Sequence, residues 1–141
     1  MKIFYIFLLC VPSIGFALTP LQNHIADLSN GYIRICASMQ ILTVKNCKSE
    51  KFLTIDDCFR DLKPLFRKSD MPIYDSVEKN YNQNWKADAT LWLKDSENGF
   101  KEYLDKYEGN NEKACIATAT QYRTYRYLKW EEIKILLNLG K

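Results

Sequence analysis

The cysteines constrain the fold of this chain of 141 residues more than any other feature of its sequence. Cys10 lies in an N-terminal segment with the form of an export signal, and the other four are Cys36, Cys47, Cys58 and Cys115. An even number of cysteines in an exported chain predicts two disulfides, although four cysteines allow three pairings and the sequence does not choose among them. Any pairing that includes Cys115 closes a loop of more than about 50 residues, which stabilises by about 4 kcal/mol in the loop-entropy model.

The first segment of the chain has the three parts of a secretion signal. Lys2 provides a basic start, residues 3–11 are an unbroken apolar run that Pro12 ends, and Gly15-Phe16-Ala17 has small residues where signal peptidase needs them. A membrane span needs about 20 apolar residues, so this run is too short to anchor the protein in a bilayer. We therefore predict a cleaved signal peptide at residues 1–17, one domain at residues 18–141, no membrane span and a periplasmic or secreted location.

Apolar residues recur at steps of three and four along much of the chain, as they do on one face of a helix. The first predicted helix starts after Thr19, which can cap it, because Pro20 is tolerated in the first turn and Gln22 is placed to complete a capping box. Its apolar face continues to about Thr43.

A second helix is predicted to begin at Thr54. Asp56 and Asp57 follow it and suit the positive end of a helix. Pro64 ends or kinks this helix, because proline lacks the backbone N–H that the helix interior needs. A turn at residues 69–72 comes next.

The rest of the chain also has helical periodicity. Residues 75–78 have the form of a capping box, and residues 75–108 read as one long helix or as two helices broken around Asn98–Gly99. A last helix is predicted from about Glu112 to Asn138. No stretch alternates polar and apolar residues as a half-buried strand does. The sequence therefore predicts an all-α fold, a single compact bundle of four or five helices stabilised by disulfides.

The charge of the chain excludes one class of partner. Lysine and arginine number 20 against 17 aspartate and glutamate, which leaves a net charge of +3 spread among mixed signs. A nucleic-acid-binding domain has a much stronger basic excess on one face. We expect no nucleic-acid partner.

Residues for catalysis or metal binding are scarce. His24 is the one histidine in the chain, and cysteines held in disulfides cannot act as nucleophiles or metal ligands. No Cys-x-x-Cys or His-x-x-x-His spacing occurs. The carboxylate pairs Asp56–Asp57 and Glu131–Glu132 are adjacent in sequence, so each pair diverges on a helix instead of converging on a substrate. We therefore expect no enzyme activity, no metal and no cofactor.

Residues 121–130 form the densest aromatic and basic segment of the chain. Tyrosine, tryptophan and arginine dominate the energetic hot spots of protein interfaces, because they bury large rigid areas and carry polar tips. The alternative is that the tyrosines belong in part to the core and the basic residues to a solvated face. The predicted partner-binding residues are Tyr122, Arg123, Tyr125, Arg126, Tyr127 and Trp130.

Three short motifs resemble the LprI-like family of small exported bacterial lysozyme-inhibitor proteins. They are the spacing Cys36 to Cys47, the run Trp92-Leu93-Lys94-Asp95, and the pattern Cys115-x4-Thr120-x2-Arg123. The family has arginine where Lys94 stands and a further cysteine after the position of Asp95, and Cys58 is additional here, so its disulfide pairing does not transfer. A weaker resemblance is to the helical periplasmic immunity proteins that neutralise type VI secretion amidases.

Both resemblances imply the same role, which is to block a cell-wall-degrading enzyme outside the cytosol. We expect a non-enzymatic inhibitor or immunity protein whose partner is a peptidoglycan-degrading enzyme, a lysozyme or an amidase. Many lysozymes are basic, so the mature chain, at +2 once Lys2 is removed with the signal, needs local acidic patches or a neutral or acidic target. The alternative is an exported carrier of a small apolar ligand, which predicts a closed cavity lined by Trp85, Trp92 and Tyr107. A secreted hydrolase would need two distant carboxylates that converge in a cleft.

Overall fold

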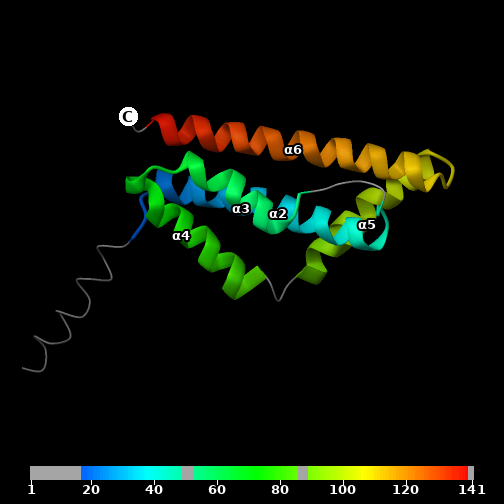
Figure 1. The fold of residues 1–141 in the computed structure, drawn as a ribbon, viewed down its shortest axis with the longest axis horizontal. Coiled ribbons are helices and arrows are strands. Elements are labelled where there is room, and N and C mark those ends of the chain that lie inside the picture. Colours follow the sequence, from blue (N-terminus) through cyan, green and yellow to red (C-terminus); the bar gives the residue numbers. More distant parts are fainter. Residues whose placement is uncertain (1–16, 49–52, 86–88, 140–141) are drawn as a thin grey trace, which may run out of the picture.

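The computed structural model describes residues 17–48, 53–85 and 89–139, and these ranges are helical with short irregular connections and no strand (Figure 1). The all-α prediction is therefore confirmed. The predicted signal peptide lies outside the described residues apart from Ala17. No helix in the described ranges is long and apolar enough to cross a membrane. The five α-helices are α2 (Pro20–Lys45), α3 (Ile55–Leu62), α4 (Met71–Asn80), α5 (Ala89–Lys106) and α6 (Asn111–Leu139).

Both predicted threonine caps are present. At the start of α2 the Gln22 N–H donates to the Thr19 hydroxyl at 3.2 Å, and the Thr19 N–H donates to the Gln22 side chain at 2.9 Å. At the start of α3 the same reciprocal bonds join Thr54 and Asp57, each at 3.1 Å. The hydrogen bonds with Thr54 lower the pKa of the Asp57 carboxyl. Asp57 thus completes the capping box at the start of α3.

Pro64 ends α3 as predicted. The α-helix stops at Leu62, and Pro64 lies inside a short 3₁₀ turn, Lys63–Leu65. A second 3₁₀ turn, Lys68–Asp70, leads into α4. A proline in the middle of an α-helix would remove one backbone hydrogen bond and clash with the preceding turn.

The predicted start of the next helix at residues 75–78 is wrong. Helix α4 already begins at Met71, with Pro72 in its first turn where the missing N–H costs nothing. The turn before it is braced by Arg67, whose backbone N–H and Nε donate to the Asp70 carboxylate at 3.1 and 3.0 Å. Residues 75–78 therefore lie inside α4.

Neither alternative for residues 75–108, one long helix or a break around Asn98–Gly99, matches the structure. Asn98 and Gly99 lie inside α5, and the interruption comes earlier: α4 ends at Asn80, a π-helical turn spans Tyr81–Trp85, and α5 begins at Ala89. A glycine inside a helix costs only about 1 kcal/mol relative to alanine. The burial of Phe100 beside Gly99 contributes more than that.

The turn between α5 and α6 is where glycine is required. Glu108 and Gly109 both have positive φ, 55° and 80°, and the Gly109 N–H donates to the Leu104 carbonyl at 2.8 Å. The side chain of Asn110 then accepts the Lys113 N–H at 3.1 Å and caps α6. The last helix was predicted from Glu112 to Asn138 and matches α6 within one residue at each end.

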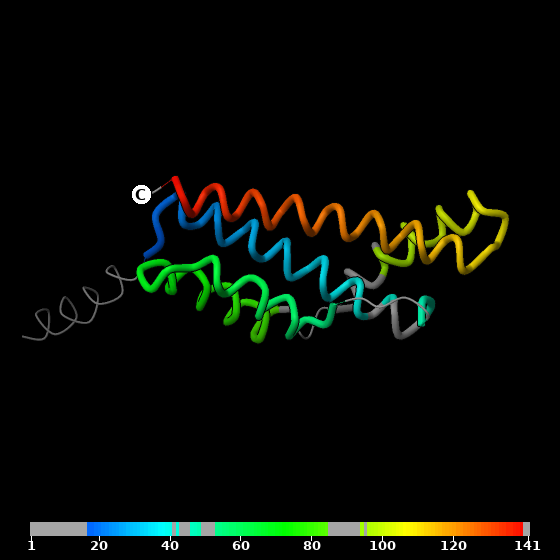
Figure 2. Tube along the Cα trace, turned by 45° about the horizontal axis from the view of Figure 1, so that its top comes forward, coloured from blue at the N-terminus to red at the C-terminus, as the bar shows by residue number. Residues whose placement is uncertain are grey.

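Helices α2 and α6 lie side by side in opposite directions along the long axis of the molecule (Figures 1 and 2). At one end α3 and α4 pack on α2, and at the other end α5 packs on both long helices. The larger core cluster, of fourteen buried residues, fills the α3–α4 end. The smaller core cluster fills the α5 end and consists of Leu42, Cys47, Phe100, Ala114 and Cys115.

The structure resolves the disulfide pairing that the sequence left open. Cys36 in α2 bonds to Cys58 in α3 within the larger core cluster, and Cys47 just beyond α2 bonds to Cys115 in the first turns of α6. All four cysteines are buried. Disulfides of this kind are typical of proteins that fold outside the reducing cytosol.

Candidate partner-binding surface

The six predicted partner-binding residues all lie on α6, but they do not form one strip. Tyr122 is partly buried against both core clusters, whereas Tyr125 and Tyr127 are 50% and 60% exposed. Successive residues of a helix point about 100° apart, so residues two positions apart point to nearly opposite sides. Arg123 is exposed, and Arg126 and Trp130 are partly buried. The six residues are therefore divided between exposed side chains and partly buried ones.

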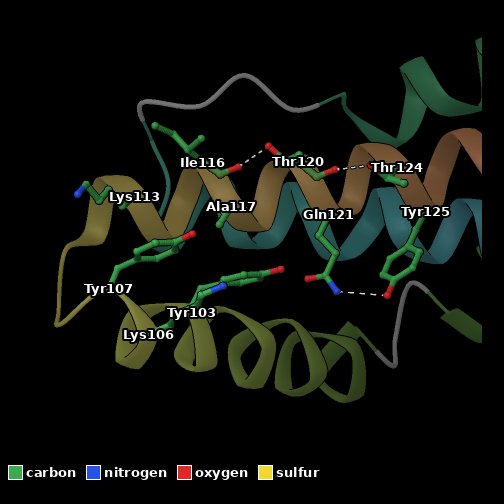
Figure 3. A pocket seen from close by; sticks show the side chains of 10 residues that line it. All are labelled: Tyr103, Lys106, Tyr107, Lys113, Ile116, Ala117, Thr120, Gln121, Thr124 and Tyr125. Atoms are coloured by element: carbon green, nitrogen blue, oxygen red, sulfur yellow. Dashed lines mark hydrogen bonds between the residues drawn. The ribbon is translucent and has the colours of Figure 1, made fainter.

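Tyr125 borders an open groove between α5 and α6, with a volume of about 780 Å³ (Figure 3). Helix α5 contributes three of the lining side chains and α6 contributes seven. The lining residues are Tyr103, Lys106, Tyr107, Lys113, Ile116, Ala117, Thr120, Gln121, Thr124 and Tyr125. None of them is acidic.

The floor of the groove is aromatic. The rings of Tyr103 and Tyr107 lie one helical turn apart on α5, nearly parallel, with centroids 6.4 Å apart. On the α6 wall of the groove the Gln121 amide donates to the Tyr125 hydroxyl at 3.3 Å, as Figure 3 shows. The Lys106 ammonium lies 5.7 Å from the centre of the Tyr107 ring. The groove thus offers flat rings to a partner, with positive charge near the α5–α6 turn.

The hydroxyl groups of two threonines in the groove donate hydrogen bonds to the backbone of their own helix. The Thr120 hydroxyl donates to the Ile116 carbonyl at 2.8 Å, and the Thr124 hydroxyl donates to the Thr120 carbonyl at 3.0 Å. Because both O–H donors are used within α6, they are not available to a partner. The α6 side of the groove is correspondingly more apolar.

A second, smaller pocket of about 220 Å³ lies where α6 meets α2 and α3. Its lining residues are Tyr32, Asp61, Arg126, Tyr127 and Trp130. The Tyr32 hydroxyl donates to the Asp61 carboxylate at 2.6 Å, and the Trp130 indole donates to the Asp61 carbonyl at 3.4 Å. Burial, and then the hydrogen bond to Asp61, raise the pKa of Tyr32 well above its usual value, while Arg126 opposes them.

These bonds give the small pocket a structural role. Trp130 and Tyr32 both fasten their helices to Asp61 at the end of α3, so they hold α6, α2 and α3 together. The Nε of Arg126 is buried and has no hydrogen-bond partner among the described residues. Of the predicted binding residues, Trp130 therefore joins α6 to α3, and Arg126 is partly buried beside it in the same pocket.

The groove residues on α5 are absent from the sequence-based prediction of the site. Tyr103, Lys106 and Lys113 come together only because α5 folds back on α6 at Gly109. Tyr103 and Tyr107 are four residues apart, a spacing that places them on one helix face, but this signal alone does not show what the face meets. Tyr107 was predicted for a closed carrier cavity and lines the open groove instead; the side chains of Trp85 and Trp92 lie outside the described residues.

His24 and the paired carboxylates lie apart from both hollows. His24 is exposed on the first turns of α2. Asp57 caps α3 and forms an ion pair with Arg60 at 3.3 Å, and Glu132 is exposed on α6.

Comparison with known proteins adds no relative. No protein-family model matches the chain, and neither the curated proteins nor the solved structures contain a match.

Proposed function

We propose that this chain is an exported, non-enzymatic binding protein that inhibits a peptidoglycan-degrading enzyme, a lysozyme or an amidase, by covering its substrate cleft in the periplasm or outside the cell. The proposal starts from the resemblance to exported lysozyme inhibitors. In the structure the Cys115-to-Arg123 part of that resemblance spans the first half of α6. Cys115 anchors it to Cys47, Thr120 lines the groove and Arg123 is exposed.

The exposure of Tyr125 and Tyr127 beside two hollows is the observation that carries the proposal. A large aromatic side chain with half of its surface in water gains free energy when a partner covers it. Interface hot spots are enriched in tyrosine and lie where rigid rings meet pockets on the partner. Each ring stands on a rigid helix next to its own hollow, so either one needs little ordering when a partner covers it.

The charge of the groove favours a partner with local negative charge. Lys106 and Lys113 line it, and no carboxylate does. A glycosidase that cleaves peptidoglycan carries two catalytic carboxylates in its cleft, and an ammonium group brought near them is attracted over a short range. The lysines thus offset the lack of long-range attraction between this chain and a basic lysozyme.

The test is inhibition of wall hydrolysis by the disulfide-intact protein. Clearing of purified peptidoglycan is measured with a lysozyme and, separately, with a wall amidase, each with increasing amounts of this protein. We expect inhibition of one enzyme class with a stoichiometric end point. Tyr125→Ala combined with Tyr127→Ala should weaken inhibition at least about 30-fold, the equivalent of one strong hot spot.

The matched control is Leu21→Ala, which removes an exposed apolar side chain from the first turn of α2, away from both hollows. It should inhibit as the unmodified protein does. If the unmodified protein slows neither enzyme class at concentrations far above that of the enzyme, the proposal is overturned.

A further inference from the structure

The second half of α6 carries an apolar stripe that no part of the described structure covers. Leu128, Ile135 and Leu139 are 56%, 57% and 68% exposed. They are separated by seven and four residues, so they lie on one side of the helix. Isolated exposed leucines are ordinary, but three large aliphatic side chains along one helix face mark an interaction surface.

The first half of the same helix forms one wall of the open groove. Ile116, 48% exposed, and Ala117 add apolar surface to the tyrosine rings there. Recognition of a helix by a groove requires an apolar face on one side and an apolar channel on the other. Helix α6 presents both, one in each half, over a length of about 43 Å.

We propose that this protein forms a two-fold symmetric dimer in which α6 of one copy pairs antiparallel with α6 of the other. The second half of each helix then fills the groove of the opposite copy. We place the two-fold axis between Tyr127 and Leu128. Each α6 residue before this point then lies opposite the residue of the other copy that is equally far beyond it. Ile116 of one copy then meets Leu139 of the other, and Thr120 meets Ile135.

The polar groups along this pairing are also complementary. Tyr125 accepts a hydrogen bond from Gln121, so its own O–H remains available to donate to the exposed Glu132 of the other copy. Lys113 faces the C-terminal end of the opposite α6, where the helix dipole is negative. Glu131, which lies between Leu128 and Ile135, comes beside the exposed guanidinium of Arg123.

A second copy fits these two surfaces better than an unrelated partner does, because stripe and groove belong to one straight helix. A two-fold axis places the stripe of each copy in the groove of the other copy at the same time, so each contact occurs twice. Since Tyr125 lies within the pairing, the dimer competes with the proposed hydrolase contact. The dimer is nevertheless measured without any hydrolase, so the two proposals fail separately.

The first test measures mass by sedimentation equilibrium on the disulfide-intact protein at micromolar concentrations and above. We expect twice the monomer mass for the unmodified chain and for the control Leu21→Glu, which places a charge at an exposed site on α2 outside the pairing. Ile135→Glu should weaken association at least tenfold with an unchanged helical circular dichroism spectrum. A monomer at every concentration, or a dimer unaffected by Ile135→Glu, overturns the proposal.

The second test fixes the direction of the pairing. Thr120→Lys alone should also weaken self-association at least tenfold, because it sets a charge against Ile135 of the other copy. An equimolar mixture of Thr120→Lys and Ile135→Glu should form a heterodimer, because one Lys–Glu pair replaces the mismatch and the second site keeps its native residues. If the mixture stays as weak as each variant alone, antiparallel pairing in this register is wrong.

Discussion

The two ends of the molecule are held together in different ways. At the α3–α4 end, the core cluster among the described side chains has fourteen buried residues, among them Tyr32, Ile33 and Ile133, and it includes the Cys36–Cys58 disulfide. At the α5 end, the core cluster among the described side chains has five residues, two of which are the cysteines Cys47 and Cys115 themselves. The open groove lies at this second end.

The difference shows how a disulfide can hold in place a region whose side chains line an open groove. The rings of Tyr103 and Tyr107 are only partly buried, and Tyr125 is 50% exposed, so all three present surface to the open groove. At this end the Cys47–Cys115 disulfide adds a covalent constraint between residues that are 68 apart in sequence. The Asn111 amide adds to it by donating to the Asn46 carbonyl at 3.1 Å, which ties the end of α2 to the start of α6.

Removing the disulfides should produce the largest effects, and unequal ones. The paired residues are 68 apart in Cys47–Cys115 and 22 apart in Cys36–Cys58. Loop entropy then gives about 4.4 kcal/mol for the first and about 3.4 kcal/mol for the second. Urea unfolding of the two double cysteine-to-alanine variants measures both losses. An equal or larger loss for the Cys36–Cys58 variant would contradict the comparison.

Truncation of core side chains comes next. Ile133 and Leu42 are both fully buried, one in each core cluster. Ile133→Ala should cost about 3 kcal/mol because the many side chains around it cannot all close the cavity. Leu42→Ala should cost about 2 kcal/mol, since a small cluster relaxes more easily into the space. The midpoints of chemical unfolding measure this difference, and a larger loss for Leu42→Ala would show that the α5 end is the tighter core.

Loss of a helix cap should have a smaller and more local effect. Thr19→Ala removes the cap of α2 at the α3–α4 end, and Asn110→Ala removes the cap of α6 at the α5 end. Each should cost about 1 kcal/mol of global stability. Amide hydrogen exchange should rise more around Asn110, because less packing holds that helix end in place. Equal local exchange at both ends would mean that the Cys47–Cys115 bond alone keeps the α5 end closed.

The smallest effect is expected at alkaline pH, and it belongs to the α3–α4 end. Burial, and then the charge of Glu78, raise the pKa of Tyr74 to about 12 from 10.0. Below pH 10 both folded and unfolded chains keep this proton, and above it the unfolded chain loses the proton first, so stability falls as pH rises towards 12. Tyr74→Phe should therefore reduce the fall in unfolding free energy between pH 9 and pH 11. An unchanged fall would assign the alkaline sensitivity to other groups.

The local features of the fold were predictable because they depend on residues three or four positions apart. Thr19 with Gln22 and Thr54 with Asp57 form their capping boxes within one helical turn, and Gly109 ends α5 for the same local reason. The start of α4 was not predicted, because residues 75–78 have capping-box form as well. Arg67 and Asp70 brace an earlier turn instead, and buried Ile73 and Tyr74 keep the first turn of α4 against the core.

The candidate site was predictable only in part. The aromatic and basic segment of α6 identified Tyr125 and Tyr127, and the sequence could not show that Tyr122, Arg126 and Trp130 turn towards α2 and α3. The groove was not predictable, since its other wall is formed by Tyr103 and Tyr107 on α5. Which side of α5 meets α6 depends on the turn at Gly109 and on the Cys47–Cys115 bond.

The sequence by itself determined that this chain is helical, where most of its helices begin and end, and that its cysteines come in an even number after Cys10. These properties follow from hydrogen bonds and periodicity within a few residues. Only the tertiary structure decided the pairing of Cys36 with Cys58 and of Cys47 with Cys115, the size of the two cores and the position of the groove. Those depend on which helix faces meet, and contacts between residues far apart in sequence are set by the packing of the whole chain.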